Sequence, residues 1–89
     1  MKFEFDQSKS ESNKVKHGVD FIEIQALWAN TKVEVPAKSE GEFRYAILGL
    51  LNGENYTVIV TYRGPVTRII SARRSTEKEI LFYEQKTKK

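Results

Sequence analysis

The sequence predicts an α+β domain: an antiparallel sheet built on a three-stranded meander, with two helices before it and one after it. The first observation is Asn52-Gly53 between two alternating apolar segments, 43–51 and 56–62, because Asn-Gly favours the type I′ turn of a β-hairpin. The second is Gly64-Pro65, which marks another reversal into segment 66–74. The third is a set of helix-capping residues at both ends of the chain. One or two further strands extend the predicted sheet.

Length and composition indicate one small domain. At 89 residues the chain holds a single core, so we treat 1–89 as one domain in which 85–89 form a frayed basic tail. A formal net charge of +3 favours an anionic partner such as RNA without requiring one. No segment is long and apolar enough to span a membrane, so we expect a cytoplasmic protein with no membrane partner.

The composition also excludes several kinds of chemistry. The absence of cysteine removes disulfides, thiol nucleophiles and cysteine-ligated zinc or iron–sulfur sites. His17 is the single histidine, so the chain has few of the side chains that zinc prefers as ligands. We therefore expect no metal and no cofactor.

Alternation in segment 2–6 predicts a short first strand, and a polar surface helix follows it over about 7–17. Asp6 caps this helix, with Ser8 and Glu11 as a competing capping box. Its apolar stripe is too narrow for a place at the centre of the core.

A second helix is predicted directly after the first. Gly18 supplies the left-handed position that ends the first helix. Asp20 and Glu23 then form a capping box, and Val19 and Ile24 occupy the two positions of a hydrophobic staple. The packing face of this second helix comprises Phe21, Ile24, Leu27 and Trp28.

The remaining elements are a strand before the meander and a helix after it. Segment 32–35 alternates as a strand that stops at Pro36, and a polar loop follows over 37–42. Thr76 and Glu79 form a capping box for the last helix.

If both turns of the meander contain an even number of residues, the alternation of side chains carries across all three strands. One face is then the core, and the other has an apolar middle that the last helix could cover. In this register Arg68 lies on the second face and Arg73 lies at the far end of the core face. The core face comprises Phe43, Tyr45, Ile47, Leu51, Tyr56, Val58, Val60, Tyr62 and Ile69. The second face also holds Arg44, Ala46, Leu48, Thr57, Ile59, Thr61, Arg63, Ile70 and Ala72.

One end of the second face gathers Arg44, Thr61, Arg63 and Arg68. Three arginines on neighbouring strands repel one another and need an anion beside them. One interpretation is a phosphate-binding patch, because guanidinium forks match phosphate oxygens in pairs. The other is a solvated sheet end in which Glu42 is the local partner.

Other candidate residues stand on weaker patterns. His17 lies at the corner between the first two helices, where it either interacts with a helix dipole or transfers protons. Lys14 and Lys16 are cations nearby. Glu79 and Tyr83 lie one helical turn apart and form either a surface pair or a pair that reaches over the arginines.

The chain resembles the BrnT family of toxins from bacterial BrnT–BrnA toxin–antitoxin pairs. The resemblance runs nearly the whole length and rests on two motifs together: Lys-His-Gly-Val-Asp-Phe at 16–21 and Arg-Ile-Ile-Ser-Ala-Arg at 68–73. Phe5 stands where the family usually shows tryptophan, and Ser75 where an alanine is common; neither removes a charged group. Further matches are Phe5-Asp6, Arg63, Glu79 and Tyr83.

The resemblance implies a RelE-like ribonuclease fold, metal-independent RNA cleavage and neutralisation by a BrnA-type antitoxin. Such an antitoxin carries a ribbon-helix-helix region, so the complex could bind operator DNA. For this cleavage we expect Arg63 and Arg68 to stabilise phosphate and His17 to transfer a proton. Arg73 either joins them or buttresses the last helix from the opposite face, and the alternation favours the buttress. The expected RNA contacts are Arg44, Thr61, Arg73, Lys14 and Lys16, and the reserves for catalysis are Glu79 and Tyr83, with the same two lysines.

Two other functions fit the same residues. One is a non-catalytic binding module that holds an anionic partner through the arginines. The other is a toxin that has lost activity and still pairs with its antitoxin. Cleavage of a purified transcript would separate both from an active ribonuclease.

Overall fold

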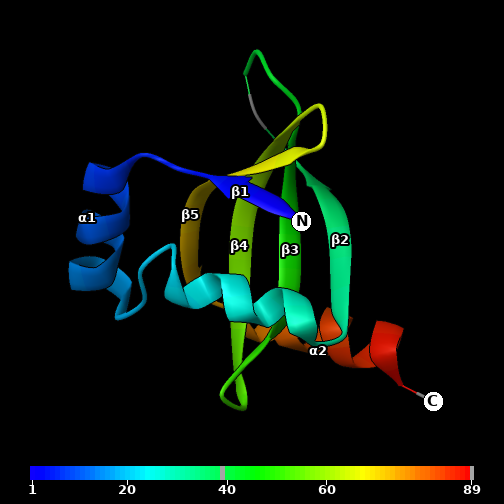
Figure 1. Cartoon of the computed structure of the whole chain (residues 1–89). Coiled ribbons are helices and arrows are strands. Elements are labelled where there is room, and N and C mark those ends of the chain that lie inside the picture. The colour runs from blue at the N-terminus through cyan, green and yellow to red at the C-terminus, as the bar shows by residue number, and fades with distance from the viewer. Residues whose placement is uncertain (39, 89) are drawn as a thin grey trace.

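The computed structural model describes residues 1–38 and 40–88, which form a five-stranded sheet with helices on both faces (Figure 1). The strand order is β1-β5-β4-β3-β2, with β1 parallel to β5 and the other neighbours antiparallel. The elements in chain order are β1 (Lys2–Glu4), α1 (Gln7–His17), the 3-10 helix η1 (Glu23–Ala29), β2 (Lys32–Ala37), β3 (Arg44–Leu51), β4 (Glu54–Arg63), β5 (Val66–Arg74) and α2 (Glu77–Thr87). The α+β prediction is confirmed, and the sheet is mixed.

The parallel β1–β5 pair corrects the prediction of an antiparallel sheet. Turn signals specify antiparallel neighbours along the chain, whereas β1 meets β5 only through tertiary packing. Phe3 packs edge-to-face on Trp28 with ring centroids 5.0 Å apart, on the main core side of the sheet. Glu4, the next residue, therefore faces the opposite side.

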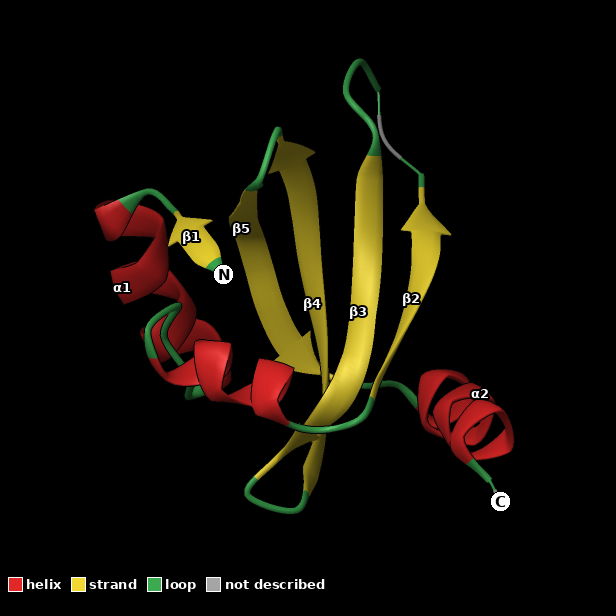
Figure 2. Cartoon of the chain, turned by 45° about the vertical axis from the view of Figure 1, so that its right-hand side comes forward, coloured by secondary structure: helices red, strands yellow, loops and turns green. Residues whose placement is uncertain are grey.

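Helices cover the two faces of the sheet unequally. In Figure 1 η1 crosses in front of the strands and α2 lies behind them, while α1 lies beside β5 (Figure 2). The main core lies between η1 and the sheet, and a smaller second core lies under α2. The main core buries Val19, Phe21, Ile24, Leu27, Ile47, Tyr56, Val58, Val60, Ile69 and Ala72. The second core buries Ala46, Leu48 and Tyr83.

The meander follows the predicted turns. Asn52 and Gly53 have φ values of 51° and 78°, as a type I′ turn requires at both central positions. The second turn also has two residues, because Arg63 pairs with Val66 across Gly64-Pro65. The alternation of faces is therefore confirmed from β3 through β4 and into the first half of β5. Phe43 and Tyr62 lie at the end of the predicted core face and are 84% and 43% exposed, so their predicted place in the core is wrong.

A β-bulge at Ile70 reverses the alternation in the second half of β5. The β4–β5 register shifts by one residue there, and Ile70 has no partner in the ladder between these two described strands. Beyond the bulge Ala72 faces the main core, and Arg73 lies opposite Thr57 on the α2 side. The predicted faces of Ala72 and Arg73 are therefore wrong, because a bulge adds a residue that turn length does not reveal.

The two N-terminal helices differ in type. α1 covers the predicted range, with Asp6 accepting from the Lys9 amide at 3.1 Å and Gly18 in the left-handed region at φ 79°. The second helix is a 3-10 helix that begins later than expected. Asp20 and Glu23 still accept from each other's backbone amides, at 2.7 and 2.9 Å, so the predicted capping box holds the corner.

η1 lies close against the sheet because β3 has a glycine beneath it. A Cβ at Gly49 would stand 2.7 Å from the Cδ2 atom of Leu27, which is fully buried. The absent side chain at Gly49 therefore sets how near the helix approaches.

β2 continues through Pro36 to Ala37, beyond the predicted stop. Because β2 is the edge strand of the described sheet, the missing amide proton of Pro36 interrupts nothing. The predicted loop over 37–42 begins inside this strand, and its residue 39 lies outside the described residues.

α2 begins at the predicted capping box and runs farther than expected. Glu79 and Thr76 exchange hydrogen bonds with each other's backbone amides. The helix extends to Thr87, so most of the predicted tail at 85–89 is helical, and residue 89 lies outside the described part. None of the helices formed by residues 1–38 and 40–88 has the length and apolar character needed to cross a membrane.

Candidate functional site

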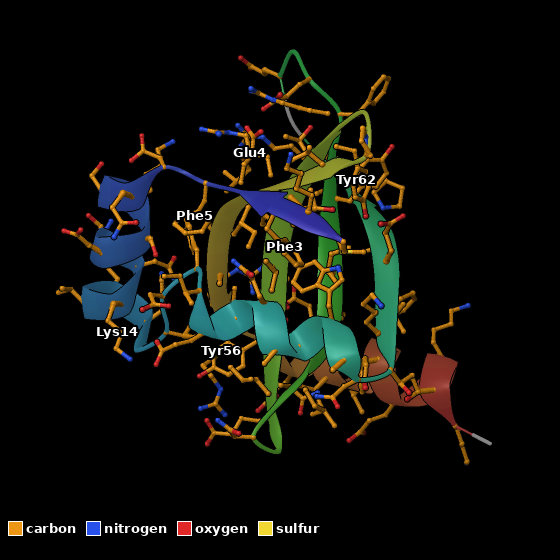
Figure 3. All side chains as sticks on the ribbon, viewed as in Figure 1. Phe3, Glu4, Phe5, Lys14, Tyr56 and Tyr62 are labelled. Atoms are coloured by element: carbon orange, nitrogen blue, oxygen red, sulfur yellow. The ribbon has the colours of Figure 1, made fainter. Side chains whose placement is uncertain are left out.

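Two arginine side chains converge on one carboxylate beside β1. Arg68 Nη1 donates to Glu4 Oε2 at 2.7 Å, and Arg63 Nη1 lies 3.7 Å from the same oxygen. The parallel register places Glu4 directly beside Arg68, and Figure 3 shows Glu4 at the end of β1 that leads to α1. We call Glu4, Arg63 and Arg68 the arginine centre.

The arginine centre has a net charge of +1, because two guanidiniums face one carboxylate. The Arg63 side chain is 56% exposed and that of Arg68 is 27% exposed, so donors on both guanidiniums remain near solvent. The position of the Glu4 carboxylate shows where an anion is held by both arginines at once. Two planar forks at such a position match the oxygens of a phosphate.

Thr61 and Arg44 border the arginine centre, and each already has a contact. Thr61 lies opposite Arg68 in the ladder, is buried, and donates its hydroxyl proton to the Phe43 carbonyl at 2.8 Å. Arg44 lies 3.6 Å from Glu42, which is the ion pair expected for a solvated sheet end. Its Nε atom is buried without a hydrogen-bond partner among the described residues, so Arg44 retains donor capacity.

Arg73 forms a separate, closed ion pair at the other end of β5. Its Nη1 and Nη2 atoms donate to the two carboxylate oxygens of Glu79 at 2.7 and 2.9 Å. Thr57 donates to the same carboxylate at 3.0 Å, and Ser75 lies 2.8 Å from the Thr57 hydroxyl. The hydrogen bonds between these two side chains lower the pKa of Glu79 to about 2 and raise the pKa of Arg73. This pair fastens α2 to β5, although from the same face as Arg68 and not the opposite one.

His17 and Lys16 lie in a third place, a shallow depression between α1 and β5. The depression encloses about 230 Å³, and both side chains are exposed. It lies alongside β5 between the positions of Arg68 and Arg73. Its lining includes Lys9, Ser12, Lys16 and His17 from α1 and Ile70 and Ser71 from β5.

Asn13 fixes α1 against the edge of β5. Its amide nitrogen donates to the Ala72 carbonyl at 2.8 Å, and its oxygen accepts from the Ala72 amide at 3.2 Å. The same nitrogen donates to the Val19 carbonyl at 2.8 Å. The side chain thus replaces a strand along the part of β5 that β1 does not reach, and it sets where His17 stands.

Two predicted residues lie away from these places. Lys14 binds Glu23 at 2.8 Å, at the end of α1 remote from Glu4 (Figure 3). Tyr83 is 7% exposed and donates its hydroxyl proton to the Thr31 carbonyl at 2.8 Å. Tyr83 therefore packs in the second core and forms no surface pair with Glu79.

The arrangement suits anion binding more than metal binding. In the part of the chain that the structure describes, no three His, Asp or Glu side chains gather in a group able to hold a metal ion. Sequence reasoning missed Glu4, Asn13 and Lys9. The alternation of 2–6 placed Glu4 on a strand, but no local pattern named β5 as the neighbour of that strand.

Fold and site together define a small basic α+β domain in which two arginines converge on one carboxylate on an incompletely covered sheet face. Residues 5–79 match the family model described as "Ribonuclease toxin, BrnT, of type II toxin-antitoxin system". Because the match covers most of the chain, this protein belongs to the BrnT family of ribonuclease toxins. A comparison with curated proteins found no match.

Proposed function

We propose that this chain cleaves RNA without a metal ion, by attack of a ribose 2′-hydroxyl on the adjacent phosphate. The observation that carries the proposal is the convergence of Arg63 and Arg68 on the Glu4 carboxylate. An RNA phosphate that replaces or shares this carboxylate would receive both guanidiniums. Their charge would stabilise the crowded phosphate of the transition state.

The reaction also needs proton transfer. As the 2′-oxygen bonds to phosphorus, its proton passes to a base, and the 5′-oxygen leaves with a proton from an acid. The products are a 2′,3′-cyclic phosphate and a free 5′-hydroxyl. His17 is the proposed proton-transfer group, because imidazole serves as either acid or base near neutral pH.

The spacing of the two places suits a nucleotide chain. Ile70 and Ser71, which line the depression with His17, follow Arg68 by two and three residues, roughly 7–10 Å along a strand. RNA that crosses β5 would therefore reach the arginine centre and His17 together. Lys16 and Arg44 are proposed as further RNA contacts, one on each side of this path.

The other predicted residues receive supporting roles. Arg73 and Glu79 hold α2, Tyr83 holds the start of β2, and Thr61 orders the backbone at Phe43. Lys14 stabilises the corner through Glu23. We assign none of these side chains a direct part in the chemistry.

We further propose a BrnA-type partner with a ribbon-helix-helix region, through which the complex binds operator DNA in the cytoplasm. The family description supports an antitoxin partner in general. The mixed sheet with helices on both faces is compatible with a RelE-like ribonuclease fold.

The test uses purified wild type, Arg68→Ala, His17→Ala and the control Arg74→Ala with a labelled transcript in excess EDTA. Arg74 pairs with Glu54 in an exposed ion pair outside the arginine centre, so its loss removes the same charge elsewhere. We expect cleavage by the wild type and the control, and a loss of roughly 100-fold or more in Arg68→Ala. The 5′ fragments should end in a 2′,3′-cyclic phosphate and the 3′ fragments should begin with a 5′-hydroxyl.

Three outcomes would contradict the proposal. Cleavage that EDTA abolishes would show a metal-dependent reaction. Equal cleavage by the folded Arg68→Ala and His17→Ala variants would remove both residues from the site. RNA binding without cleavage by the wild type would indicate a binding module or a decayed toxin.

A further inference from the structure

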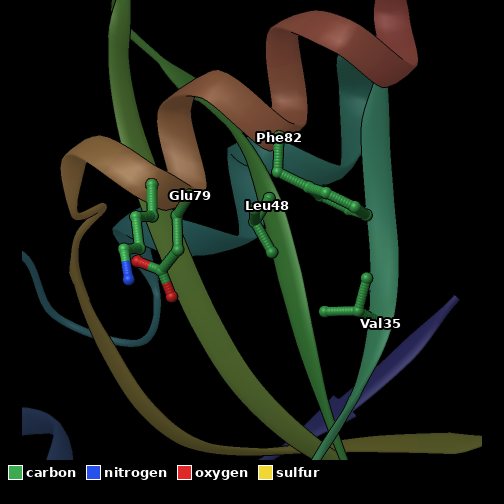
Figure 4. A pocket seen from close by; sticks show the side chains of 5 residues that line it. Val35, Leu48, Glu79 and Phe82 are labelled. Atoms are coloured by element: carbon green, nitrogen blue, oxygen red, sulfur yellow. The ribbon is translucent and has the colours of Figure 1, made fainter.

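The second core is only partly buried where α2 packs on β2 and β3. Among the described residues, the main core buries ten residues, whereas the second buries three and leaves six hydrophobic residues partly buried around them. Between α2 and the strands lies an open apolar depression of about 310 Å³. We call it the apolar wedge; Val35, Leu48, Phe82, Lys78 and Glu79 line it (Figure 4).

The wedge has an apolar floor and a cationic rim. Figure 4 shows Phe82 reaching from α2 toward β2, with Val35 and Leu48 on the strands below it. Lys78 and Lys86 stand one helical turn before and after Phe82, and Lys86 Nζ lies 5.5 Å from the Phe82 ring centroid. None of the ion pairs between described residues involves either lysine.

The one carboxylate in the wedge does not offset these lysines. Glu79 is bound on both oxygens by Arg73, so the charges of that pair cancel. The wedge therefore presents an apolar slot beside uncompensated positive charge. The complementary ligand is an acidic polypeptide segment with a large apolar side chain.

We infer that the wedge is the docking site for such a segment of the antitoxin, with its apolar side chain between Phe82 and Val35 and its carboxylates at Lys78 and Lys86. RNA is the less suitable occupant, because the slot is walled by hydrocarbon and the guanidinium of Arg73 is already bound to Glu79 in its lining. The inference rests on the proposed function only for the identity of the partner. It places antitoxin binding on the face that also carries the arginine centre.

The experiment measures binding of the protein encoded beside this chain's gene, by titration calorimetry, to the wild type and two matched pairs of variants. Phe82→Ala is compared with Leu81→Ala, an exposed leucine on the same helix outside the wedge. Lys78→Glu is compared with Lys88→Glu, an equal change of charge just past the helix end. We expect Kd to rise roughly 10-fold or more in both wedge variants and less than about 3-fold in both controls.

RNA cleavage by the same variants separates the possible failures. Cleavage by both wedge variants should stay near the wild-type rate, since neither residue belongs to the arginine centre. Loss of cleavage with unchanged antitoxin affinity would assign the wedge to RNA and overturn the inference. Unchanged affinity in every variant, or no binding by the wild type, would overturn it as well. Antitoxin binding that depends on the wedge in a chain that cleaves no RNA would support the inference and contradict the proposed function alone.

Circular dichroism and thermal melting establish that each variant is folded. Phe82 is partly buried, so Phe82→Ala can also destabilise the fold. Val35→Thr is therefore a second test of the wedge, because it places a hydroxyl there at nearly constant volume. Val35→Thr should also weaken antitoxin binding, by roughly 3- to 10-fold. Unchanged affinity in a folded Val35→Thr chain together with a folded Phe82→Ala chain would remove the wedge from the interface.

Discussion

Arg68 and Arg73 project from the same face of β5, although residues five positions apart on a regular strand face opposite sides, because the bulge at Ile70 inserts one residue between them. Their surroundings nevertheless differ. Arg68 shares the Glu4 carboxylate with Arg63 and leaves a surplus of positive charge. Arg73 is matched one to one by Glu79. Arg68 thus belongs to a group with a net positive charge, whereas Arg73 belongs to a neutral pair that joins β5 to α2.

The Arg73–Glu79 pair predicts an acid-dependent loss of stability. The folded pKa of Glu79 lies near 2, below its ordinary value of 4.5, so its contribution is complete above that ordinary value and disappears as pH falls toward 2. Glu79→Gln should lower the free energy of unfolding by about 1–2 kcal/mol at pH 7, allowing for partial solvent screening. Urea unfolding at pH 7, 4 and 2.5 should show the gap between variant and wild type closing at low pH. A gap that stays constant over this range would refute the assignment.

Removal of the Glu4 carboxylate should strengthen RNA binding. Glu4→Gln removes the carboxylate that binds Arg63 and Arg68, so a phosphate no longer has to compete with that carboxylate for the two guanidiniums. We expect a roughly 3- to 10-fold lower Kd for a 2′-O-methyl oligonucleotide, measured by fluorescence anisotropy at fixed salt. Glu84→Gln on α2 is the control for the change in net charge. Equal gains in both variants would indicate a general charge effect and no competition at the arginine centre.

Asn13 should be among the most sensitive polar residues of the fold. Asn13→Ala removes three hydrogen bonds and leaves the Ala72 amide and carbonyl groups of the β5 edge without this partner. The expected cost is about 2–4 kcal/mol in the free energy of unfolding, against about 0.5 kcal/mol for the exposed neighbour Ser12→Ala. Hydrogen exchange at the Ala72 amide should accelerate in Asn13→Ala. Unchanged exchange there would show that α1 is held by other contacts.

Gly49→Ala should destabilise the packing of η1 on β3. The new methyl group would stand 2.7 Å from Leu27 Cδ2, and the buried Leu27 side chain has little room to move. We expect a cost of about 1–3 kcal/mol from overpacking, measured by chemical denaturation. The double variant Gly49→Ala with Leu27→Val should lose less unfolding free energy than the sum of the losses in the two single variants. Strict additivity would indicate that the two positions do not touch.

The sequence predicted what depends on neighbours along the chain. The Asn52-Gly53 turn, the Asp20 and Glu23 capping pair and the end of α1 at Gly18 all appear in the structure, because each is decided within a few residues. The 3-10 form of η1 was not predicted. Its capping residues favour a helix start without fixing the helix type.

What depends on distant neighbours was not predictable in the same way. The bulge at Ile70 lies inside a strand whose residues continue an ordinary alternation, so Arg73 was placed on the wrong face. Glu4 was not recognised as the partner of Arg63 and Arg68, since nothing local names the strand beside β1. The end of the sheet at which the arginines gather was predicted, whereas the anion between them was not.

The parallel pairing of β1 with β5 also determines when the site comes into being. Glu4 and Arg68 lie 64 positions apart, so during synthesis the first strand leaves the ribosome long before its neighbour has been translated. At elongation rates of roughly 5–20 residues per second, the nascent chain passes several seconds without an arginine centre. The contact between Glu4 and Arg68 can therefore form only after β5 has emerged.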